Sequence, residues 1–511
     1  MMGKSYILAH DLGTTGNKAT LWADSGELTA STFFGYRTFF PRPLWVEQDP
    51  NEWWNAVVGA TKNLLEQTSI APGSVAAISF SGQMMGCVPV DAQGNPLGRS
   101  IIWSDARAVE EARFINQQIS PEKMYELTGT PAVPNYTLAK IMWLKKNCPE
   151  TYKKASFFLQ AKDYIVFRLT GKVATDYSDA STTNLFGLEK KKWLEEIAEV
   201  AGIDLIKLPP AYSSSTVVGG LRSEIANQLG LLPGTPIVIG GGDGACATVG
   251  AGAVQEAETY CYLGSSAWIA FVKHVPIFDK SARTFVFCHP DPELYVNVGT
   301  MQAAGISYEW LGEVLCPRSG NEDGGGNVYD TMNHEAQRVT PGARGLLFLP
   351  YLLGERSPYW NPNARGAFIG LSRTHDRRDL IRSVLEGIAF NLGLIFEALV
   401  ENGAAIKEIT LIGGMAKNNL FCEILTNVFG RPVYIPSMVN EATSLGAAII
   451  GGVGIGLFES LNEVHRFLKI ENSLVPDNRL TDFYREVLLI FKDAYMALAK
   501  IFDRIVWLQD L

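Results

Sequence analysis

The first segment of this sequence that could do phosphate chemistry lies near the N-terminus. An apolar run at 6–9 is followed by Asp11 and by Gly13-Thr14-Thr15, before a second apolar run at 19–22. A tight hairpin turn exposes backbone N–H groups, and its hydroxyl groups can reach phosphate oxygens. A carboxylate at the strand end can hold Mg²⁺, and Lys18 could add positive charge. An ordinary glycine-containing hairpin explains the same residues equally well. The segment is not a P-loop, because the chain has no G-x-x-x-x-G-K-[ST] motif.

A second hydroxyl-bearing turn repeats this plan in the other half of the chain. Gly264-Ser265-Ser266 lies between apolar runs at 259–263 and 268–272. Taken alone, it is most simply a plain β-turn. Two such turns facing each other across a cleft could hold a nucleotide's phosphate chain from both sides. The pair therefore predicts a nucleotide site more strongly than either turn does.

A run of glycines at 240–242 follows the predicted strand 236–239 and introduces Asp243. Glycines let the backbone pass close to a ligand, and α/β sheets place their sites at the carboxyl ends of strands. We interpret Asp243 as a candidate general base, with a solvated loop aspartate as the simpler alternative. The segment also matches G-x-G-x-x-A, a dinucleotide-binding fingerprint. That reading is disfavoured because the acidic residue about 20 positions on, Glu258, precedes the next strand instead of ending it.

Gly413-Gly414-Met415 and Asn418 lie between a predicted strand at 409–412 and a predicted helix at 419–429. Exposed backbone at such a turn could receive an adenine ring. A glycine-rich strand-to-helix turn is also a common structural device, so this segment decides nothing alone.

Other prominent side chains are interpreted more simply as packing. Met84-Met85 is predicted to form part of a pocket wall, because unbranched thioethers fill irregular apolar space. Trp45, Trp53 and Trp54 are expected in the core or at its edge, in preference to a sugar-stacking platform.

The elements that must position these residues alternate between strands and helices. Besides the runs above, 75–80 reads as a buried strand, whereas 52–67, 140–145 and the stretch from Asp163 read as helices. This pattern and the repeated hairpin predict an α/β protein of two domains, 1–252 and 253–511, joined at the small-residue stretch 250–253. Residues 321–327, with three glycines and two acids, are predicted to be a surface loop.

Composition sets limits on function. The chain has 511 residues, 47% hydrophobic and 19% charged, which is globular and not disordered. Its net charge of −9 argues against a general binder of nucleic acid or of anionic membranes. Seven scattered cysteines without a C-x-x-C pair suggest a reducing cytoplasm and no zinc site. We expect neither a signal peptide nor a membrane span, because the longest small-apolar run, 444–458, is short of the about 20 residues that a span needs.

These motifs, in this order, resemble the FGGY family of carbohydrate kinases over nearly the whole chain, and within that family the xylulokinases. Both family signatures are recognisable, one around Lys140-Ile141-Met142-Trp143-Leu144 and the other over 366–386. Further matching segments are Pro43-Leu44-Trp45-Val46-Glu47-Gln48-Asp49-Pro50, Trp53-Trp54, Gly82-Gln83-Met84, Trp103-Ser104-Asp105-Ala106-Arg107, Lys162-Asp163-Tyr164, Leu349-Pro350-Tyr351 and Gly354-Glu355-Arg356-Ser357-Pro358.

The resemblance implies an actin-like ATPase fold, with two ribonuclease-H-like domains and a cleft between them. It implies ATP-dependent phosphorylation of a sugar hydroxyl, first of all D-xylulose to D-xylulose 5-phosphate, with Asp243 as the base. It further implies that Asp11 and Asp243 are the metal-associated carboxylates for Mg²⁺, and it implies the following nucleotide and substrate positions. The nucleotide-binding positions are Gly13, Thr14, Thr15, Lys18, Gly264, Ser265, Ser266, Gly305, Glu309, Gly414, Met415 and Asn418. The substrate-binding positions are Gln83, Met84, Met85, Trp103, Asp105, Asp243 and Gly244.

Two departures from the xylulokinase pattern leave the sugar open. Xylulokinases typically carry His where this chain has Met85, and Asn where it has Gly244. Both changes remove a group that would hydrogen-bond sugar hydroxyls, and such groups discriminate strongly between substrates. Another ketose such as ribulose, a sugar acid such as gluconate, or a polyol is therefore an alternative substrate.

Two further classes are weighed against the kinase. A sugar-sensing regulator with a kinase-like fold would usually append a helix-turn-helix, and neither the start of the chain nor its acidic charge fits one. A cytoskeletal or chaperone-type ATPase would share the fold but not the sugar-kinase signatures. The expected partners are thus a small sugar and ATP, with no nucleic acid or membrane. A homodimer is possible by analogy with relatives.

Overall fold

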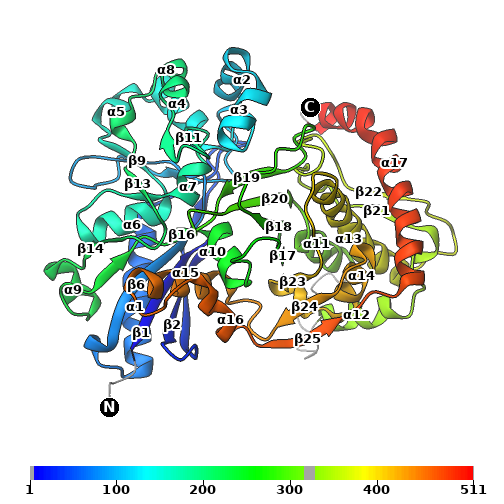
Figure 1. Cartoon of the computed structure of the whole chain (residues 1–511). Coiled ribbons are helices and arrows are strands. Elements are labelled where there is room, and N and C mark those ends of the chain that lie inside the picture. Colours follow the sequence, from blue (N-terminus) through cyan, green and yellow to red (C-terminus); the bar gives the residue numbers. More distant parts are fainter. Residues whose placement is uncertain (1–4, 316–327, 510–511) are drawn as a thin grey trace, which may run out of the picture.

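The computed structural model describes residues 5–315 and 328–509. These residues form two lobes, each built on a mixed β-sheet with helices packed against it (Figure 1). The segment 321–327, predicted to be a surface loop, lies outside the described residues.

The sheet of the first lobe has the strand order β14-β15-β6-β1-β2-β3, and β16 also pairs with β6. Strands β1, β2 and β3 are antiparallel neighbours, whereas β1, β6 and β15 run parallel. The predicted first hairpin is confirmed, with Asp11 opposite Lys18. The strands are β1 (Tyr6–Leu12), β2 (Gly16–Ala23), β3 (Leu28–Gly35), β6 (Val75–Gly82), β14 (Val217–Gly220), β15 (Pro236–Val238) and β16 (Gly241–Gly242).

The sheet of the second lobe has the order β19-β20-β18-β17-β23-β24-β25. Read in the opposite direction to the first sheet, β20-β18-β17-β23-β24 corresponds to β3-β2-β1-β6-β15. Its first hairpin, β17–β18, is antiparallel, and β17, β23 and β24 run parallel, as β1, β6 and β15 do. The repeat predicted from the two hairpins therefore extends over the whole sheet. The strands are β17 (Thr259–Leu263), β18 (Ala267–Lys273), β19 (Phe285–Cys288), β20 (Tyr295–Met301), β23 (Ile409–Ile412), β24 (Val433–Pro436) and β25 (Ile470–Leu474).

Short ladders and helices complete the lobes. The ladders pair β4 (Thr38–Phe39), β5 (Glu47–Gln48) and β8 (Ser100–Ile101); β7 (Val88–Val90) and β9 (Phe157–Leu159); β10 (Thr175–Asp176) and β13 (Ala211–Tyr212); β11 (Phe186–Gly187) and β12 (Lys192–Trp193); β21 (Leu347–Leu349) and β22 (Ala367–Ile369). The α-helices before residue 252 are α1 (Pro50–Thr68), α2 (Val109–Gln118), α3 (Pro121–Thr128), α4 (Thr137–Asn147), α5 (Pro149–Lys154), α6 (Ala161–Thr170), α7 (Tyr177–Ser181), α8 (Glu195–Ala201), α9 (Ser223–Leu229) and α10 (Asp243–Gly250). Those after it are α11 (Gly305–Leu315), α12 (Val328–Gln337), α13 (Arg377–Glu401), α14 (Asn419–Phe429), α15 (Ala442–Gly454), α16 (Val464–Phe467) and α17 (Asn478–Gln509).

The first lobe has a core of apolar side chains from its sheet, α1 and α6, which includes Trp53 and Trp54. Both indoles are almost fully buried, so the prediction that they pack in the core is confirmed. Helix α1 begins after Asp49, whose carboxylate accepts the Asn51 amide hydrogen bond as an N-cap.

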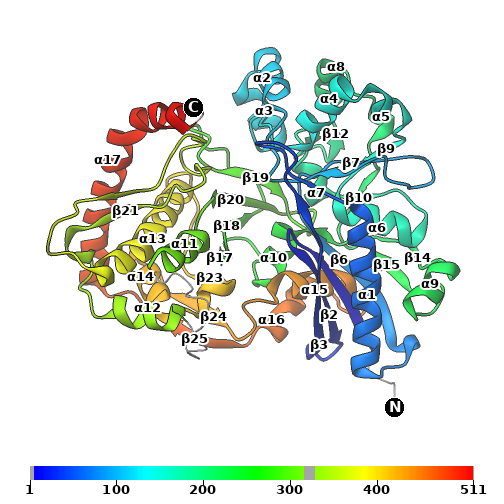
Figure 2. The ribbon, with the colours of Figure 1, turned by 180° about the vertical axis from the view of Figure 1, so that it is seen from behind.

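Two helices, α10 and α15, lie between the lobes (Figures 1 and 2). Helix α15 comes from the second half of the sequence, yet its apolar side chains join the core of the first sheet. It meets α10 through Gly250 and Gly446. A Cβ at Gly250 would lie 1.7 Å from the Ala442 carbonyl oxygen, and one at Gly446 would lie 1.9 Å from that of Cys246. Only glycine permits this backbone contact, which joins the two halves along the second half of α10.

Helix α13 is long and apolar enough to cross a membrane by length and composition, but 89% of its most apolar window is buried inside the protein. Its side chains belong to the core of the second lobe. Core helices of globular domains have the same composition, so this helix is weak grounds for a membrane span.

Candidate active site

Asp11 and Asp243 lie at the same edge of the first sheet. Asp11 is opposite Ser81 in the parallel pair β1–β6, and Gly241 is opposite Ser81 on its other side in the pair β16–β6. The Ser81 hydroxyl donates to Asp11 Oδ1 at 2.8 Å. Asp243 follows β16 directly as the first residue of α10. It is therefore neither at the end of a long strand nor in a solvated loop, and it begins a helix that lies between the lobes.

The two carboxylates influence each other's protonation. Burial, and then the negative charge of Asp11, raise the pKa of Asp243 to about 7, although the Gly244 amide donates to its Oδ1 at 2.7 Å. Burial also raises the pKa of Asp11, against the opposing effects of Ser81 and Lys18. Asp243 thus has the pKa of a proton acceptor that works near neutral pH.

A hydrogen-bond chain fixes the backbone in front of Asp243. The Gly242 amide donates to Ser178 Oγ at 3.0 Å, and that hydroxyl donates to Asp176 Oδ2 at 2.5 Å. Met84 packs against the other side of this peptide, because a Cβ at Gly242 would come within 2.5 Å of the Met84 side chain. The position of the candidate base is therefore set by partners on both sides of β16.

Asp176 belongs to a fully buried cluster that is centred on Lys162. The ammonium of Lys162 lies 2.7 Å from Asp163, 2.8 Å from Asp176 and 3.0 Å from Asp179. Burial raises the pKa of Asp163 and of Asp179, whereas the three carboxyl groups together raise that of Lys162 despite its burial. One cation therefore compensates several buried acids behind the site.

Side chains of the first lobe hold the first predicted phosphate turn, Gly13-Thr14-Thr15. Tyr36 donates its hydroxyl to the Gly13 carbonyl, and Gln48 donates to the Thr14 carbonyl at 2.6 Å. Trp103 Nε1 donates to Thr14 Oγ1 at 2.9 Å, so a predicted sugar-binding residue touches a predicted phosphate-binding one. Thr15 is exposed at the tip of the turn.

Lys18 does not extend freely toward the turn. Its ammonium donates to the Asn440 carbonyl at 2.9 Å and lies 3.8 Å from the Glu441 carboxylate. It thus links β2 to the residues just before α15, and a phosphate contact by Lys18 stays a prediction.

The second predicted phosphate turn, Gly264-Ser265-Ser266, contacts the start of α11. Gly264 N donates to the Ser266 carbonyl across the turn, and Gly305 N donates to the Gly264 carbonyl, both at 3.0 Å. The position of a Cβ at Gly305 would be 3.4 Å from the Met415 sulfur. The structure therefore brings together three segments that were predicted separately. Glu309 is exposed one turn further along α11.

The remaining predicted adenosine residues follow β23. Gly414 and Met415 begin a short 3₁₀ helix at 414–417. Asn418 uses its Oδ1 to cap α14 through Phe421 N at 3.1 Å, and its Nδ2 donates to Asn333 Oδ1 at 2.7 Å. Its amide group is thus already engaged, and contact with adenosine stays a prediction.

The predicted substrate residues of the first lobe divide into two groups. Gln83 is linked to the first predicted turn: its amide donates to Gln48 Oε1 at 2.8 Å, Gln48 donates to the Thr14 carbonyl, and the Gln83 Oε1 is buried without a partner among the described residues. Asp105 is different, because its carboxylate is fully buried and pairs with Arg107 at 2.7 Å. Its carboxylate also accepts from the Val46 amide at 2.6 Å, so a direct sugar contact by Asp105 stays a prediction.

Two cations that residue types alone did not single out lie next to Met85. The Lys140 ammonium, fully buried, donates to the Met85 carbonyl at 2.8 Å and to the Ile102 carbonyl at 2.7 Å, and burial lowers its pKa to about 7. Arg356 comes from the second lobe, and its Nη2 lies 4.0 Å from the Met85 sulfur. Lys140 and Arg356 belong to the segments 140–144 and 354–358 that resemble the FGGY family. That resemblance was the only feature of the sequence that pointed to them.

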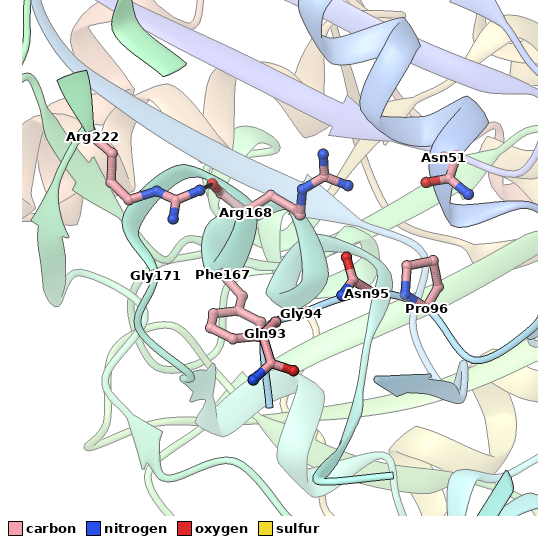
Figure 3. A pocket seen from close by; sticks show the side chains of 9 residues that line it. All are labelled: Asn51, Gln93, Gly94, Asn95, Pro96, Phe167, Arg168, Gly171 and Arg222. Carbon is pink, nitrogen blue, oxygen red and sulfur yellow. Dashed lines mark hydrogen bonds between the residues drawn. The ribbon is translucent and has the colours of Figure 1, made fainter. Parts of the chain in front are cut away.

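A cavity of about 340 Å³ lies elsewhere on the first lobe (Figure 3). Arg222 reaches across its rim to donate to the Arg168 carbonyl at 2.9 Å. It contains none of the predicted site residues; it is lined by Asn51, Gln93, Gly94, Asn95, Pro96, Phe167, Arg168, Gly171 and Arg222.

Comparison with known proteins identifies both halves of the chain. Residues 6–250 match the model of the N-terminal domain of the FGGY family of carbohydrate kinases, and residues 259–455 match that of its C-terminal domain. A xylulose kinase of Staphylococcus epidermidis is 33% identical over 97% of both chains. A gluconokinase of Bacillus subtilis is 32% identical over 95% of both chains. The solved structure of a ligand-bound xylulose kinase from Lactobacillus acidophilus superposes with a TM-score of 0.91 at 28% identity, covering 98% of this chain and 100% of that one.

Proposed function

Because the chain belongs to the FGGY family of carbohydrate kinases, we propose that it transfers the terminal phosphate of ATP to D-xylulose, giving D-xylulose 5-phosphate, with Asp243 as the general base. The actin-like two-domain fold and the sugar-kinase activity follow from family membership, and ATP is the phosphoryl donor of the family. The choice of sugar and the role of each residue are our proposal.

The observation that supports the base most strongly is the environment of Asp243. It is the first residue of α10, half-buried, and subject to the charge of Asp11, and its pKa is about 7. A carboxylate with that pKa can accept a proton from a bound hydroxyl at neutral pH. As the new oxygen–phosphorus bond forms, the hydroxyl proton passes to Asp243, and the bond from the terminal phosphorus to the ADP oxygen breaks.

The rest of the site positions the reactants. Phosphoryl transfer depends mainly on alignment and charge neutralisation. The turns Gly13-Thr14-Thr15 and Gly264-Ser265-Ser266 offer backbone N–H groups and hydroxyls to phosphate oxygens. Trp103 joins the sugar side of the site to the first turn through Thr14. We assign Gln83 to a sugar hydroxyl, because its buried Oε1 lacks a partner among the described residues.

A magnesium ion fits the carboxylates on chemical grounds. No cluster of three or more His, Cys, Asp or Glu side chains suited to a metal occurs within 5–315 and 328–509. Mg²⁺ in kinases commonly uses one or two carboxylates together with waters and substrate phosphates. Asp11, whose Oδ1 accepts from Ser81 and whose Oδ2 has no hydrogen-bond partner among the described residues, and Asp243 would suffice. The ion would neutralise phosphate charge.

A sugar acid such as gluconate is the second candidate substrate. The Arg356 guanidinium lies beside Met85 and forms no ion pair among the described residues, although the Arg356 amide donates to Glu355 Oε1 at 2.8 Å. Lys140 adds a second nitrogen behind Met85. An arginine without an acidic partner is suited to a substrate carboxylate. The gluconokinase relative, at 32% identity, does not favour xylulose over this alternative.

A substrate panel decides between the candidates. The purified enzyme is assayed with ATP and with D-xylulose, D-ribulose, gluconate and a polyol, using coupled detection of ADP. Our proposal predicts the highest kcat/KM for D-xylulose. A higher value for gluconate would replace the sugar but leave the base assignment intact, and ADP release that needs no sugar would reject both.

Three broader expectations stay predictions. They are the division into domains 1–252 and 253–511, a cytoplasmic location, and a homodimer. Helix α15 packs on the first sheet, so a single boundary after residue 252 assigns to the second domain a helix that packs in the first lobe.

A further inference from the structure

Strand β17 directs two tyrosines at the start of α10. Tyr260 and Tyr262 are two positions apart, so their side chains lie on the same face of the sheet. The Tyr260 hydroxyl donates to the Gly244 carbonyl at 3.1 Å and lies 3.0 Å from Thr248 Oγ1. Tyr262 is two residues closer to the second phosphate turn, and it therefore faces the N-terminus of α10, where Asp243 stands.

The ring of Tyr262 is held rigidly. In the antiparallel pair β17–β18 it lies opposite Trp268, and the two rings stack with centroids 4.0 Å apart and planes 12° apart. Trp268 is fixed in turn, because its Nε1 donates to the Tyr260 hydroxyl at 2.9 Å. The three aromatic residues therefore form one unit that joins the β17–β18 hairpin to the first turn of α10.

The hydroxyl of Tyr262, in contrast, has no partner. It makes no hydrogen bond with any residue in the described part of the chain, although the side chain is half-buried. It lies against the second phosphate turn, since a Cβ placed at Gly264 would be 2.8 Å from it. Burial and the charges of Asp11 and Asp243 raise the pKa of Tyr262 to about 12, so it keeps its proton at neutral pH.

We propose that the Tyr262 hydroxyl donates a hydrogen bond to the terminal phosphate of the nucleotide, and that Trp268 positions it for this contact. The inference rests on the proposed function, because it assumes that phosphate lies between Asp243 and the second turn. A neutral donor is suited to that place: it binds an oxygen of the transferring group without forming an ion pair with either carboxylate. Nothing about Tyr262 stood out in the sequence, where an aromatic residue in an apolar strand suggests the core.

The test compares ligands that differ only in the terminal phosphate. Tyr262→Phe keeps the ring and the stack, and it removes a hydroxyl without partners, so the fold is retained. Calorimetry with ADP and with β,γ-methylene ATP measures both affinities for the wild type and the variant. We expect about tenfold weaker binding of the ATP analogue, unchanged binding of ADP, and a kcat lower by about ten- to a hundredfold, as for a hydrogen bond to a charged group.

Controls separate this contact from other roles. Tyr212→Phe removes an exposed hydroxyl on β13 and should change neither affinity. Trp268→Phe should reproduce the loss for the analogue in weaker form. An unchanged ratio of analogue to ADP affinity in Tyr262→Phe, or a loss confined to sugar binding, overturns the proposal. The affinities do not depend on proton transfer, so they remain informative even if Asp243 is not the base.

Discussion

The guanidinium of Arg356 lies 4.0 Å from the sulfur of Met85, although the two residues are 271 positions apart and belong to different lobes. Met85 itself has a left-handed backbone, with φ of 61°, and its carbonyl accepts the Lys140 ammonium. Met85, whose position carries histidine in typical xylulokinases, therefore lies between an arginine and a lysine. We expect substitutions around Met85 to change the choice of sugar.

Arg356→Met should affect sugar acids more than neutral sugars. Loss of the guanidinium removes a charged hydrogen-bond partner of a substrate carboxylate. For gluconate, this loss corresponds to a fall in kcat/KM of about tenfold or more. We expect the ratio of kcat/KM for gluconate to that for D-xylulose to fall at least about tenfold. Arg373→Met, at an exposed position of the same lobe, is the control. Equal losses for both sugars would show that Arg356 holds the fold and not a carboxylate.

The double variant Met85→His, Gly244→Asn should raise kcat/KM for D-xylulose. Position 244 has room for a side chain, because a Cβ there would be 3.5 Å from Phe287 and 3.6 Å from Met84, which is ordinary contact. The two new groups can hydrogen-bond sugar hydroxyls, and we expect a gain of about tenfold in steady-state assays. Gly244→Ala adds the Cβ without the amide and should give no gain. A fall in kcat/KM for D-xylulose would mean that this pocket does not bind that sugar.

The sequence predicted the central residues well because their signals are local. Asp11 and Asp243 come directly after or close after apolar runs of sequence and lie near glycines, and the β1–β2 and β17–β18 hairpins each lie within about 20 residues of chain. Pairing of strands does the rest: the ladders β1–β6 and β6–β16 bring Asp11 and Gly241 to the two sides of Ser81.

What the sequence could not predict depends on distant contacts. Lys162 and Lys140 look like the polar side of helices, yet both are fully buried against partners from other segments. Asp176 comes 14 residues after Lys162, and the Met85 carbonyl comes 55 residues before Lys140. The carboxylate of Asp105, which is predicted to contact the sugar, also accepts a hydrogen bond at 2.6 Å from the amide of Val46, 59 positions earlier in the chain. Helix α15 packs on the sheet of the first lobe through contacts between residues that are far apart in the sequence.

Ser178→Ala should lower kcat and leave both KM values nearly unchanged. The substitution removes the acceptor of the Gly242 amide, which loosens the peptide next to Asp243, and we expect a loss of about tenfold from one buried hydrogen bond. Ser214→Ala is a matched control, because the Ser214 hydroxyl donates to the same Asp176 oxygen at 2.7 Å, whereas the Gly242 amide donates to Ser178. Equal effects of the two variants would assign the loss to the buried cluster in general.

The pH profile of kcat/KM should follow the protonation of Asp243. Only the carboxylate can accept a proton, and the pKa of Asp243 is about 7. Activity should therefore rise tenfold per pH unit below that value and level off above it. Asp11→Asn removes a like charge, so the midpoint of its residual activity should move to lower pH. A profile that is flat from pH 5 to 8 would contradict a base with this pKa.

The most direct test of the account is the kcat of purified, folded Asp243→Asn with ATP and the best sugar of the substrate panel. The amide keeps the shape of the side chain but cannot accept the proton, so kcat should fall by about a hundredfold to ten-thousandfold. Binding of β,γ-methylene ATP, measured by calorimetry, should persist. Turnover within about threefold of the wild type would contradict the assignment of Asp243 as the base.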